Sequence, residues 1–499
     1  MISTTRPLSV LMVCAHEPTL DPRIRWEAEA ASPRFDVTVL GFNREDESKP
    51  AFEHTGRYRI VRLRRTNMSA LQYLGRFQDI FPPSARVALL AVLIAALPVA
   101  LLIELAVRML RNEAAPLNRA VLQLKTVALL RAALRRTGLP ANSSRLRDRA
   151  IFIILSLRNG FAPAAALFLN HIFAMPVKPD VIHCNDLDTL LVGVLAKKKF
   201  GCRVIYDAHE FWPVADSLCT WLDTAFFSLL ERLLIGKVDA VVTVNPMLAA
   251  AIRDKYRLRY VYSVPNAEPW IDERPELANR SGMAEQAAGR VKFLFQGRFT
   301  VARGIDEIIR GWVLVDGERA ALFLRGPENP WRRKAEMLAA ELGVLGRSVY
   351  FLEAVTEDEL VAAAGEADVG IVPYLPLAIN ERLACPNKLS QYLHAGLMVL
   401  TNDLPYVRSV VEEAGIGMFY NSSDLSTFAD AVNRIVEDPE LLRRCQDSAR
   451  AFARNSFNWQ LHGDLFLRLY AGEVDGEPAG ASSRQTPLAL PIQVRNDAE

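Results

Sequence analysis

A single lysine stands where a helix would not place it for its own stability. Residues 367–401 read as a buried strand, a loop, a helix that begins near Pro386 and Asn387 and ends at Gly396, and a second buried strand. The start of such a helix presents free backbone N–H groups and the positive end of the helix dipole. Lys388 lies in this first turn, where the dipole repels it. A phosphate supplied from outside the chain would explain its presence.

Two arginines flank a second strand-to-helix turn. The strand Val291–Phe295 is followed by a loop that carries Arg298 and Arg303, and a helix is expected at Ile305–Val313. Two guanidinium groups five residues apart around such a turn could clamp a diphosphate. Two solvated surface arginines are the alternative. Together with Lys388, the arginines favour a phosphate site.

These two stretches resemble the donor-binding half of a glycosyltransferase with two facing Rossmann-like domains, the GT-B architecture. The nearest group is the large retaining family 4. Its members typically read Gly-Arg, a short loop and Lys-Gly, and later a helix like Pro-Asn-Lys-Leu-Phe-Glu-Tyr-Met-Ala-Ala-Gly. Here Arg303 takes the lysine position and Gln391 the glutamate position. The resemblance covers about residues 7–67 and 179–471.

The resemblance implies which residues bind a nucleoside diphosphate sugar. Arg298 and Arg303 are expected to stabilise the charge that grows on the leaving nucleotide, which is electrophilic catalysis. The family's earlier glutamate falls here on Leu383, which leaves the contact with the donor sugar open. An amide at Gln391 can still hydrogen-bond the ribose hydroxyls. The expected donor-binding residues are Gly297, Gly326, Glu381, Asn387, Lys388 and Gln391.

The densest cluster of ionisable residues at a strand end in the first half begins at Asp207. The resemblance makes His209 the candidate for the residue that approaches the donor sugar, and a structural histidine satisfied by Asp207 is the alternative. Glu210 could steady the histidine ring or orient an acceptor hydroxyl. Arg23 and Asp186 follow two other strands, so we expect them on the acceptor side of the cleft between the two sheets.

Two aspartates in these loops are also helix-capping candidates. Asp21 precedes Pro22, which suits the first position of a helix. Asp186 and Asp188 resemble a metal-binding pair, but capping of the helix that follows is the simpler interpretation. We therefore expect no metal and no cofactor beyond the nucleotide sugar, because side-chain cations can neutralise the phosphates.

Strands and helices alternate along most of the chain, which predicts an α/β fold with two facing parallel sheets. The expected strands are Leu8–Ala15, Asp36–Gly41, Tyr58–Leu63, Asp180–Cys184, Arg203–Tyr206, Ala240–Val244 and Val261–Val264, then Val291–Phe295, Ala321–Leu324, Val349–Leu352, Val369–Pro373, Met398–Leu400 and Gly417–Tyr420. The expected domains are an N-terminal acceptor domain (1–266) with a helical insertion (about 68–176), a linker (267–290), a nucleotide-sugar domain (291–457), a helix that crosses back (458–471) and a disordered tail (472–499).

The charge distribution points to a membrane surface rather than to nucleic acid. The net charge is only +2, but residues 57–158 hold 18 Lys and Arg against four Asp and Glu. This basic stretch is interleaved with aliphatic residues, which favours an anionic membrane. It lacks the interleaved exposed aromatics of a nucleic-acid binder. The six cysteines show no paired spacing, and Met1–Leu8 is too short for a signal peptide, so we expect a cytoplasmic protein.

One segment within this basic stretch could contact the membrane directly. Val87–Ile103 contains 17 residues without a charge, but Pro98 interrupts it and a spanning helix needs about 20. Three interpretations stay open: a spanning hairpin with Ala150–Ala174, a helix that lies on the membrane, and an ordinary buried helix. We expect the protein at the inner face of the membrane.

The leading hypothesis is a retaining, metal-independent hexosyltransferase. Its acceptor would be lipid-linked or a growing polysaccharide, as in surface polysaccharide biosynthesis. Two alternatives share the fold. A nucleotide-sugar 2-epimerase would need the donor site but no acceptor, and a noncatalytic scaffold would explain the departures at Gln391 and Leu383.

Overall fold

The computed structural model of the chain describes residues 6–43, 49–64, 161–212, 221–272, 277 and 281–474. Most of the expected insertion, including Val87–Ile103, lies outside the described residues, as do part of the expected linker and the tail from residue 475. Within the described ranges, no helix is long and apolar enough to cross a membrane.

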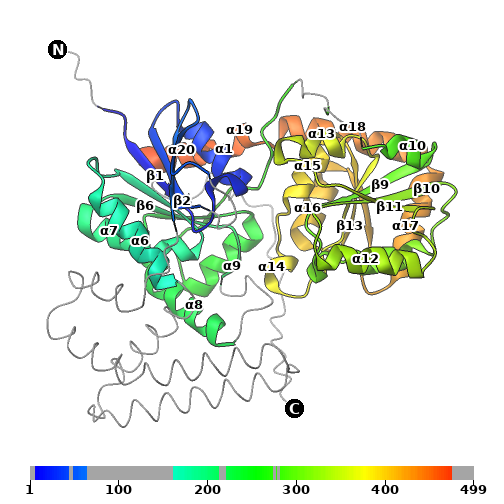
Figure 1. Ribbon diagram of the computed structural model, residues 1–499, viewed down its shortest axis with the longest axis horizontal. Coiled ribbons are helices and arrows are strands. Elements are labelled where there is room, and N and C mark those ends of the chain that lie inside the picture. Colours follow the sequence, from blue (N-terminus) through cyan, green and yellow to red (C-terminus); the bar gives the residue numbers. More distant parts are fainter. Residues whose placement is uncertain are drawn as a thin grey trace, which may run out of the picture.

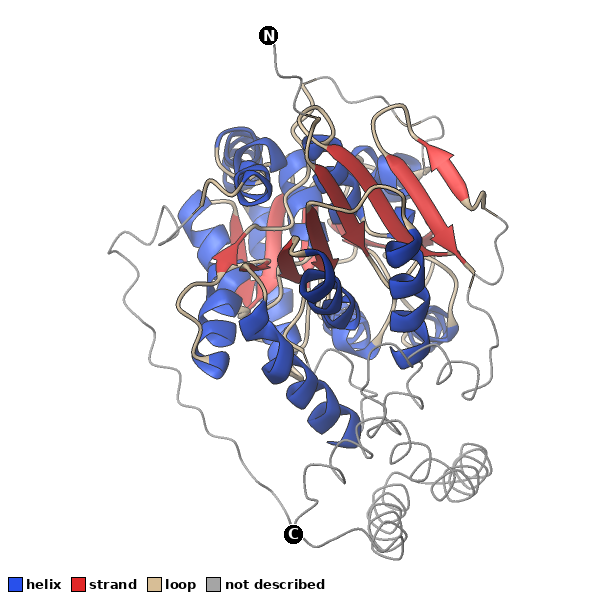
Figure 2. Ribbon diagram, turned by 90° about the vertical axis from the view of Figure 1, so that its left-hand side faces the viewer, coloured by secondary structure: helices blue, strands red, loops and turns tan. Residues whose placement is uncertain are grey.

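The first half of the chain forms an eight-stranded sheet in the order β3-β4-β2-β1-β5-β6-β7-β8. Every neighbouring pair is parallel except β3 and β4, and helices lie on both faces (Figure 2). The strands are β1 (Ser9–Val13), β2 (Asp36–Phe42), β3 (Phe52–His54), β4 (Arg59–Leu63), β5 (Val181–Asn185), β6 (Arg203–Ala208), β7 (Ala240–Thr243) and β8 (Tyr262–Ser263). The helices include α1 (Pro22–Ala31), α6 (Phe161–Ala174), α7 (Leu187–Phe200), α8 (Trp221–Leu234) and α9 (Pro246–Tyr256).

The central strands are apolar because both faces of the sheet are covered. All five residues of β1 are buried, and so are all five residues of β5. Since these strands are parallel, their carboxyl ends meet at one edge of the sheet. The loops that follow β1, β5 and β6 therefore lie close together, and they carry the polar residues singled out above.

The second half forms a six-stranded parallel sheet in the order β11-β10-β9-β12-β13-β14. The strands are β9 (Val291–Gln296), β10 (Ala320–Arg325), β11 (Val349–Leu352), β12 (Val369–Val372), β13 (Met398–Asn402) and β14 (Gly417–Tyr420). The helices are α10 (Met283–Ala287), α11 (Ile305–Trp312), α12 (Pro330–Glu341), α13 (Leu360–Ala364), α14 (Ile379–Arg382), α15 (Asn387–Ala395), α16 (Pro405–Ala414), α17 (Leu425–Glu437) and α18 (Pro439–Asn455). The two facing α/β domains confirm the predicted fold class.

After α18 the chain returns to the first domain, where its last described helices lie beside α1 (Figure 1). The crossing takes the form of two short helices, α19 (Trp459–His462) and α20 (Asp464–Ala471), rather than one. The Trp459 ring packs 5.6 Å from Trp26 of α1, and Tyr470 is buried beneath α1. The last described residues therefore complete the core of the first domain.

Strand β3 was not predicted from the sequence. It has three residues and pairs in antiparallel fashion with β4 at the edge of the sheet. Its Phe52 is 59% exposed, so the alternation that marks a half-buried strand is absent there. A short edge strand leaves little hydrophobic signal in the sequence.

Candidate active site

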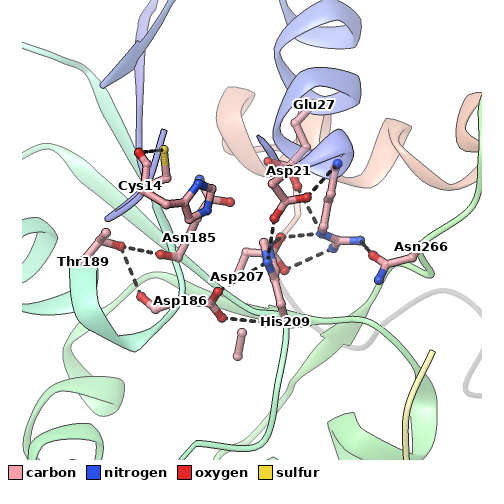
Figure 3. Close-up of polar contacts among 12 residues, drawn as sticks. Cys14, Asp21, Glu27, Asn185, Asp186, Thr189, Asp207, His209 and Asn266 are labelled. Carbon is pink, nitrogen blue, oxygen red and sulfur yellow. Dashed lines mark hydrogen bonds and ion pairs between the residues drawn. The ribbon is translucent and has the colours of Figure 1, made fainter. Parts of the chain in front are cut away.

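His209 lies among three carboxylates at the carboxyl edge of the first sheet (Figure 3). Its Nε2 is 3.1 Å from Asp207, at the end of β6. Its Nδ1 is 3.3 Å from Asp21, in the loop after β1, and 3.5 Å from Asp186, directly after β5. The imidazole thus ties together three loops that are distant in sequence. The alternative interpretation, a structural histidine satisfied by Asp207, accounts for the contact of Nε2 and leaves the two contacts of Nδ1 unexplained.

Arg23 lies at the base of this cluster and is only 2% exposed. It forms a bidentate ion pair with Asp207, at 2.7 Å from Nε and 3.1 Å from Nη2. Its Nη1 donates to the carbonyl of Val264 and to Asn266 Oδ1. We expected Arg23 on the acceptor side, and the structure places its guanidinium beneath the site, where it holds Asp207.

A second buried group lies behind Arg23. Glu27 is 3.3 Å from Arg23 Nε and 3.6 Å from His183 Nε2, and His183 Nδ1 lies 2.6 Å from the Tyr470 hydroxyl. Glu27, His183 and Asp207 offer ligand atoms within 4.8 Å of one another, as a metal site would. Arg23 already supplies a positive charge against both carboxyl groups, and this favours an ion-pair network over a cation site.

Burial and the close charges set the protonation states of this cluster. Burial opposes charge on the His209 imidazole, but Asp186 and Asp207 raise its pKa well above the usual value. Burial alone would raise the pKa of Asp207, yet Arg23 and His209 hold it well below the usual range. Burial and the neighbouring Asp207 raise the pKa of Glu27 well above its usual value. These shifts favour the protonated forms of His209 and Glu27 and the ionised form of Asp207.

Asp186 does not cap helix α7 through its side chain, contrary to our expectation. It adopts φ 63° and ψ 169°, a backbone conformation that a non-glycine residue rarely adopts. Its Oδ1 instead accepts from the backbone N–H of His209 at 3.1 Å and from Trp212 Nε1 at 3.3 Å. The strained backbone turns this carboxylate toward the histidine loop. Asp21, by contrast, caps α1 as predicted, accepting from Arg23 N.

Lys388 is the central residue of the second domain's site. It lies in the first turn of α15 and is only 6% exposed. Its Nζ is 3.9 Å from the centre of the Phe295 ring and 4.8 Å from that of Tyr374. Among the described residues it has no hydrogen-bond or ion-pair partner. Burial, and then the positive charge of Arg303, lower its pKa well below the usual value.

The two predicted arginines differ in their surroundings. Arg303 is half-buried, with its guanidinium carbon 3.8 Å from the centre of the Tyr374 ring, and it shares this ring with Lys388. Arg298 is exposed. Neither arginine forms an ion pair within the part of the chain that the structure describes. The structure thus pairs Arg303 with Lys388 around one aromatic ring, and it places Arg298 at the surface of the same loop.

The glycines of the predicted donor site bring two loops into contact. Gly297 has φ 136°, which a residue with a side chain rarely adopts, and a Cβ there would lie 3.5 Å from Lys388 Nζ. A Cβ on Gly326 would lie only 2.1 Å from the carbonyl oxygen of Gly297. Gly326 is therefore needed for packing of the loops that follow β9 and β10, and its contact with the nucleotide stays a prediction.

The remaining donor-site candidates lie on α14 and α15. Asn387 is half-buried at the first position of α15. Gln391 is 6% exposed, and its Oε1 accepts from Gln296 Nε2 at 3.1 Å. Glu381 on α14 is half-buried, and its Oε2 is buried without a hydrogen-bond partner among the described residues. Such an unsatisfied oxygen is suited to accept from a ligand hydroxyl.

The strand-end loops of the two domains meet directly. The backbone N–H of Phe211, two residues after His209, donates to Asn380 Oδ1 at 2.6 Å. Glu210 lies between His209 and Phe211 in the sequence. It is close enough to both domains for their charges to shift its pKa. Partial desolvation and then Asp186 raise its pKa to about 7, and Arg303 opposes this shift. The histidine loop and the cations of the second domain therefore belong to one site.

Sequence reasoning missed three participants in this site. Tyr374, two residues after β12, is the ring beneath both cations. Its place just beyond a strand end was the available signal. Gln296 holds Gln391, and Asn266 holds Arg23. Nothing in the spacing of these two residues marks a contact over 95 or 243 positions.

Two family models match this chain. Residues 104–266 match the glycosyl transferase 4-like domain, and residues 290–438 match the glycosyl transferases group 1. Together these ranges cover more than half of the chain. The D-inositol 3-phosphate glycosyltransferase of Nocardia farcinica is 24% identical over 336 residues, which are 63% of this chain and 72% of that protein.

Solved structures share the fold. Sucrose-phosphate synthase from Thermosynechococcus elongatus aligns over 93% of this chain and 99% of its own, with a TM-score of 0.60 and 15% identity. HepE from Anabaena, solved in complex with UDP and glucose, aligns over 93% and 100%, with a TM-score of 0.57 and 11% identity. The fold is GT-B, and the two family models show that the chain is a glycosyltransferase. Within that class, the chain belongs to the family 4 type.

Proposed function

We propose that this protein transfers a hexosyl unit, with retention and without a metal ion, from a nucleoside diphosphate sugar to an acceptor held by the first domain. One observation carries the proposal. Lys388 and Arg303 share the Tyr374 ring, repel each other, and form no ion pair with any described residue. Two cations held together beside one aromatic ring need an anion, and a pyrophosphate supplies that charge.

The donor would lie between the two domains. Its pyrophosphate would contact Lys388 and Arg303 beside the start of α15, with Arg298 closing over it from the surface of the loop. The charge on this group grows as the glycosidic bond breaks, so fixed cations stabilise the transition state more than the ground state. Glu381 is the side chain for the sugar hydroxyls, in place of the acidic residue that Leu383 replaces. The structural neighbour from Anabaena, solved with UDP and glucose, supports a donor of this class.

The first domain supplies the groups around the acceptor. Both ring nitrogens of His209 face carboxylates, which raise its pKa, so we assign it an electrostatic role, not that of a base. Glu210 is the better candidate to orient an acceptor hydroxyl, because its carboxyl group titrates near neutral pH beside Arg303. Asp186 and Arg23 position these two residues. We keep a lipid-linked or polysaccharide acceptor, at the inner face of a membrane, as part of the proposal.

A thermal-shift screen against nucleotide sugars tests the proposal. UDP, GDP and ADP and their hexose conjugates form the panel, and the best conjugate is then incubated with the protein and candidate acceptors. We expect one nucleotide series to stabilise the protein, and we expect transfer to depend on an acceptor. An isomerised sugar released without any acceptor would establish the 2-epimerase instead. If no member of the panel bound, the noncatalytic scaffold would replace both enzymes.

A further inference from the structure

Two asparagine side chains of the first domain reach across to the same segment of the second. Asn245, two residues after β7, donates from Nδ2 to the carbonyl of Leu383 at 2.7 Å. Asn266, which follows β8, donates from Nδ2 to the carbonyl of Cys385 at 3.2 Å. Both acceptors lie in residues 378–386, the last part of the segment between β12 and α15.

A third asparagine makes the reciprocal contact. Asn380, within that segment, accepts from the backbone N–H of Phe211 in the histidine loop at 2.6 Å. The three hydrogen bonds join the loops after β6, β7 and β8 to one stretch of the second domain. We call Asn245, Asn266 and Asn380 the asparagine clasp.

The first-domain members of the clasp use both ends of the amide. Asn245 Oδ1 accepts from Leu248 N at 2.8 Å and so caps α9. Asn266 Oδ1 accepts from Arg23 Nη1 at 3.1 Å. The oxygen thus fixes each side chain within the first domain, while the nitrogen is directed to the second. A neutral group that accepts and donates at once is required, which an amide provides and a carboxylate does not.

The clasp connects the two halves of the candidate site. The segment it holds contains Glu381 and leads directly into α15, whose first turn carries Lys388. In the first domain, hydrogen bonds connect Asn266 to Arg23, Arg23 to Asp207, and Asp207 to His209. A shift of one domain against the other would strain or break these bonds.

We propose that Asn245, Asn266 and Asn380 are positioning residues that fix the two domains in the arrangement in which donor and acceptor groups face each other. This inference rests on the proposed transfer function for its catalytic part. The claim about the relative placement of the two domains does not depend on the transfer function.

The test replaces the amides by carboxylates of the same shape. Asn245→Asp and Asn266→Asp together keep both oxygen acceptors, remove both interdomain donors and set negative charges against two carbonyls. We expect a larger radius of gyration in small-angle X-ray scattering of the unliganded protein, and faster hydrogen–deuterium exchange of the Phe211 amide. Turnover should fall about tenfold or more, because only the closed fraction is competent. The Kd for whichever of UDP, GDP or ADP binds the parent best should stay within about twofold, because the cations lie in one domain.

A matched control makes the same substitution inside one domain. Asn329 caps α12 by accepting from Trp331 N, and its Nδ2 donates to the carbonyl of Phe299 at 3.1 Å. Asn329→Asp should leave the radius of gyration and the exchange of the Phe211 amide at the parent's values. If the double variant does not fold, Asn266→Asp alone carries the same comparison.

Unchanged scattering and exchange in the double variant would overturn the clasp, as would an equal change in the Asn329→Asp control. Looser domains with parental turnover would overturn its positioning role. The transfer proposal fails separately, if the parent protein binds none of the three nucleotides. The scattering and exchange measurements still decide the clasp in that case.

Discussion

The two domains hold the cations of the candidate site in opposite ways. In the first domain, Arg23 and His209 are matched by the carboxylates of Asp207, Asp186 and Asp21. At the candidate site of the second domain, Arg303 and Lys388 lie against aromatic rings and form no ion pair with a described residue, whereas Arg325 and Arg332, away from that site, pair with carboxylates. The cations of the first cluster find their counter-charges within the protein, and we expect this cluster to stabilise the fold. The second lacks its anion, which is the mark of a binding site.

This comparison predicts that removing Arg23 lowers the stability of the protein, whereas removing Lys388 leaves the stability of the unliganded protein unchanged or raises it. Arg23→Met would leave the buried carboxylate of Asp207 without its principal cation. We expect the free energy of unfolding to fall by about 3–5 kcal/mol in urea denaturation, since a broken buried ion pair leaves an uncompensated charge.

Arg25→Met is the control for that variant. Arg25 lies on the same helix, but its ion pairs with Glu357 and Asp358 are partly exposed. We expect a change within about 1 kcal/mol, which is typical of surface ion pairs. A loss at Arg23 no larger than that at Arg25 would show that the first cluster is not the stabilising network described here.

Glu210, at the junction between the domains, should determine part of the pH dependence of turnover. The pKa of Glu210 is raised to about 7, so its carboxylate forms only as the pH rises through neutrality. If this carboxylate orients the acceptor, kcat/KM should rise with an apparent pKa of about 7. Glu210→Gln should abolish that limb of the profile.

The same shift has a consequence for stability. The folded-state pKa lies above the ordinary carboxyl value, so the folded protein holds this proton more tightly than the unfolded chain. Stability should therefore decline between about pH 4.5 and 7 through this group, and Glu210→Gln should flatten that part of the curve. An unaltered pH–rate profile in Glu210→Gln would assign the neutral-pH limb to another group.

The smallest effect is expected where the last helix meets the first cluster. Tyr470→Phe removes the hydroxyl that lies 2.6 Å from His183 Nδ1, and we expect a loss of ~1–2 kcal/mol. Tyr420→Phe is the control, because the Tyr420 hydroxyl has no hydrogen-bond partner among the described residues. Equal losses in the two variants would show that the contact with His183 contributes nothing specific.

The sequence was most informative where residues lie near each other along the chain. The strand–helix alternation predicted both sheets, and Pro386 and Asn387 identified the start of α15. Asp21 was correctly read as a cap because a cap is a local contact. Asp186 has the same local pattern, but its side chain turns to His209 and the backbone is strained.

Contacts between distant loops could not be derived from the sequence. Arg23 lies in a polar stretch of the sequence, where an exposed side chain would be expected. In the structure it is buried and pairs with Asp207, which lies 184 positions away. The same holds for Asn266 and for Tyr374, whose partners come from other loops. Strand order decides which loops meet, and that order is not encoded in any local pattern.

The substitution Lys388→Met tests the central claim most directly. Methionine keeps the length of the side chain and removes the buried charge, so the unliganded protein should unfold at the same temperature or higher. The nucleotide should no longer stabilise it, whereas the parent should gain ~2.7 kcal/mol at 100 times its Kd. Lys334→Met, at a surface ion pair with Asp306, should keep the full nucleotide response. A Lys388→Met variant that is destabilised without ligand, or that still binds the nucleotide as the parent does, would contradict the account.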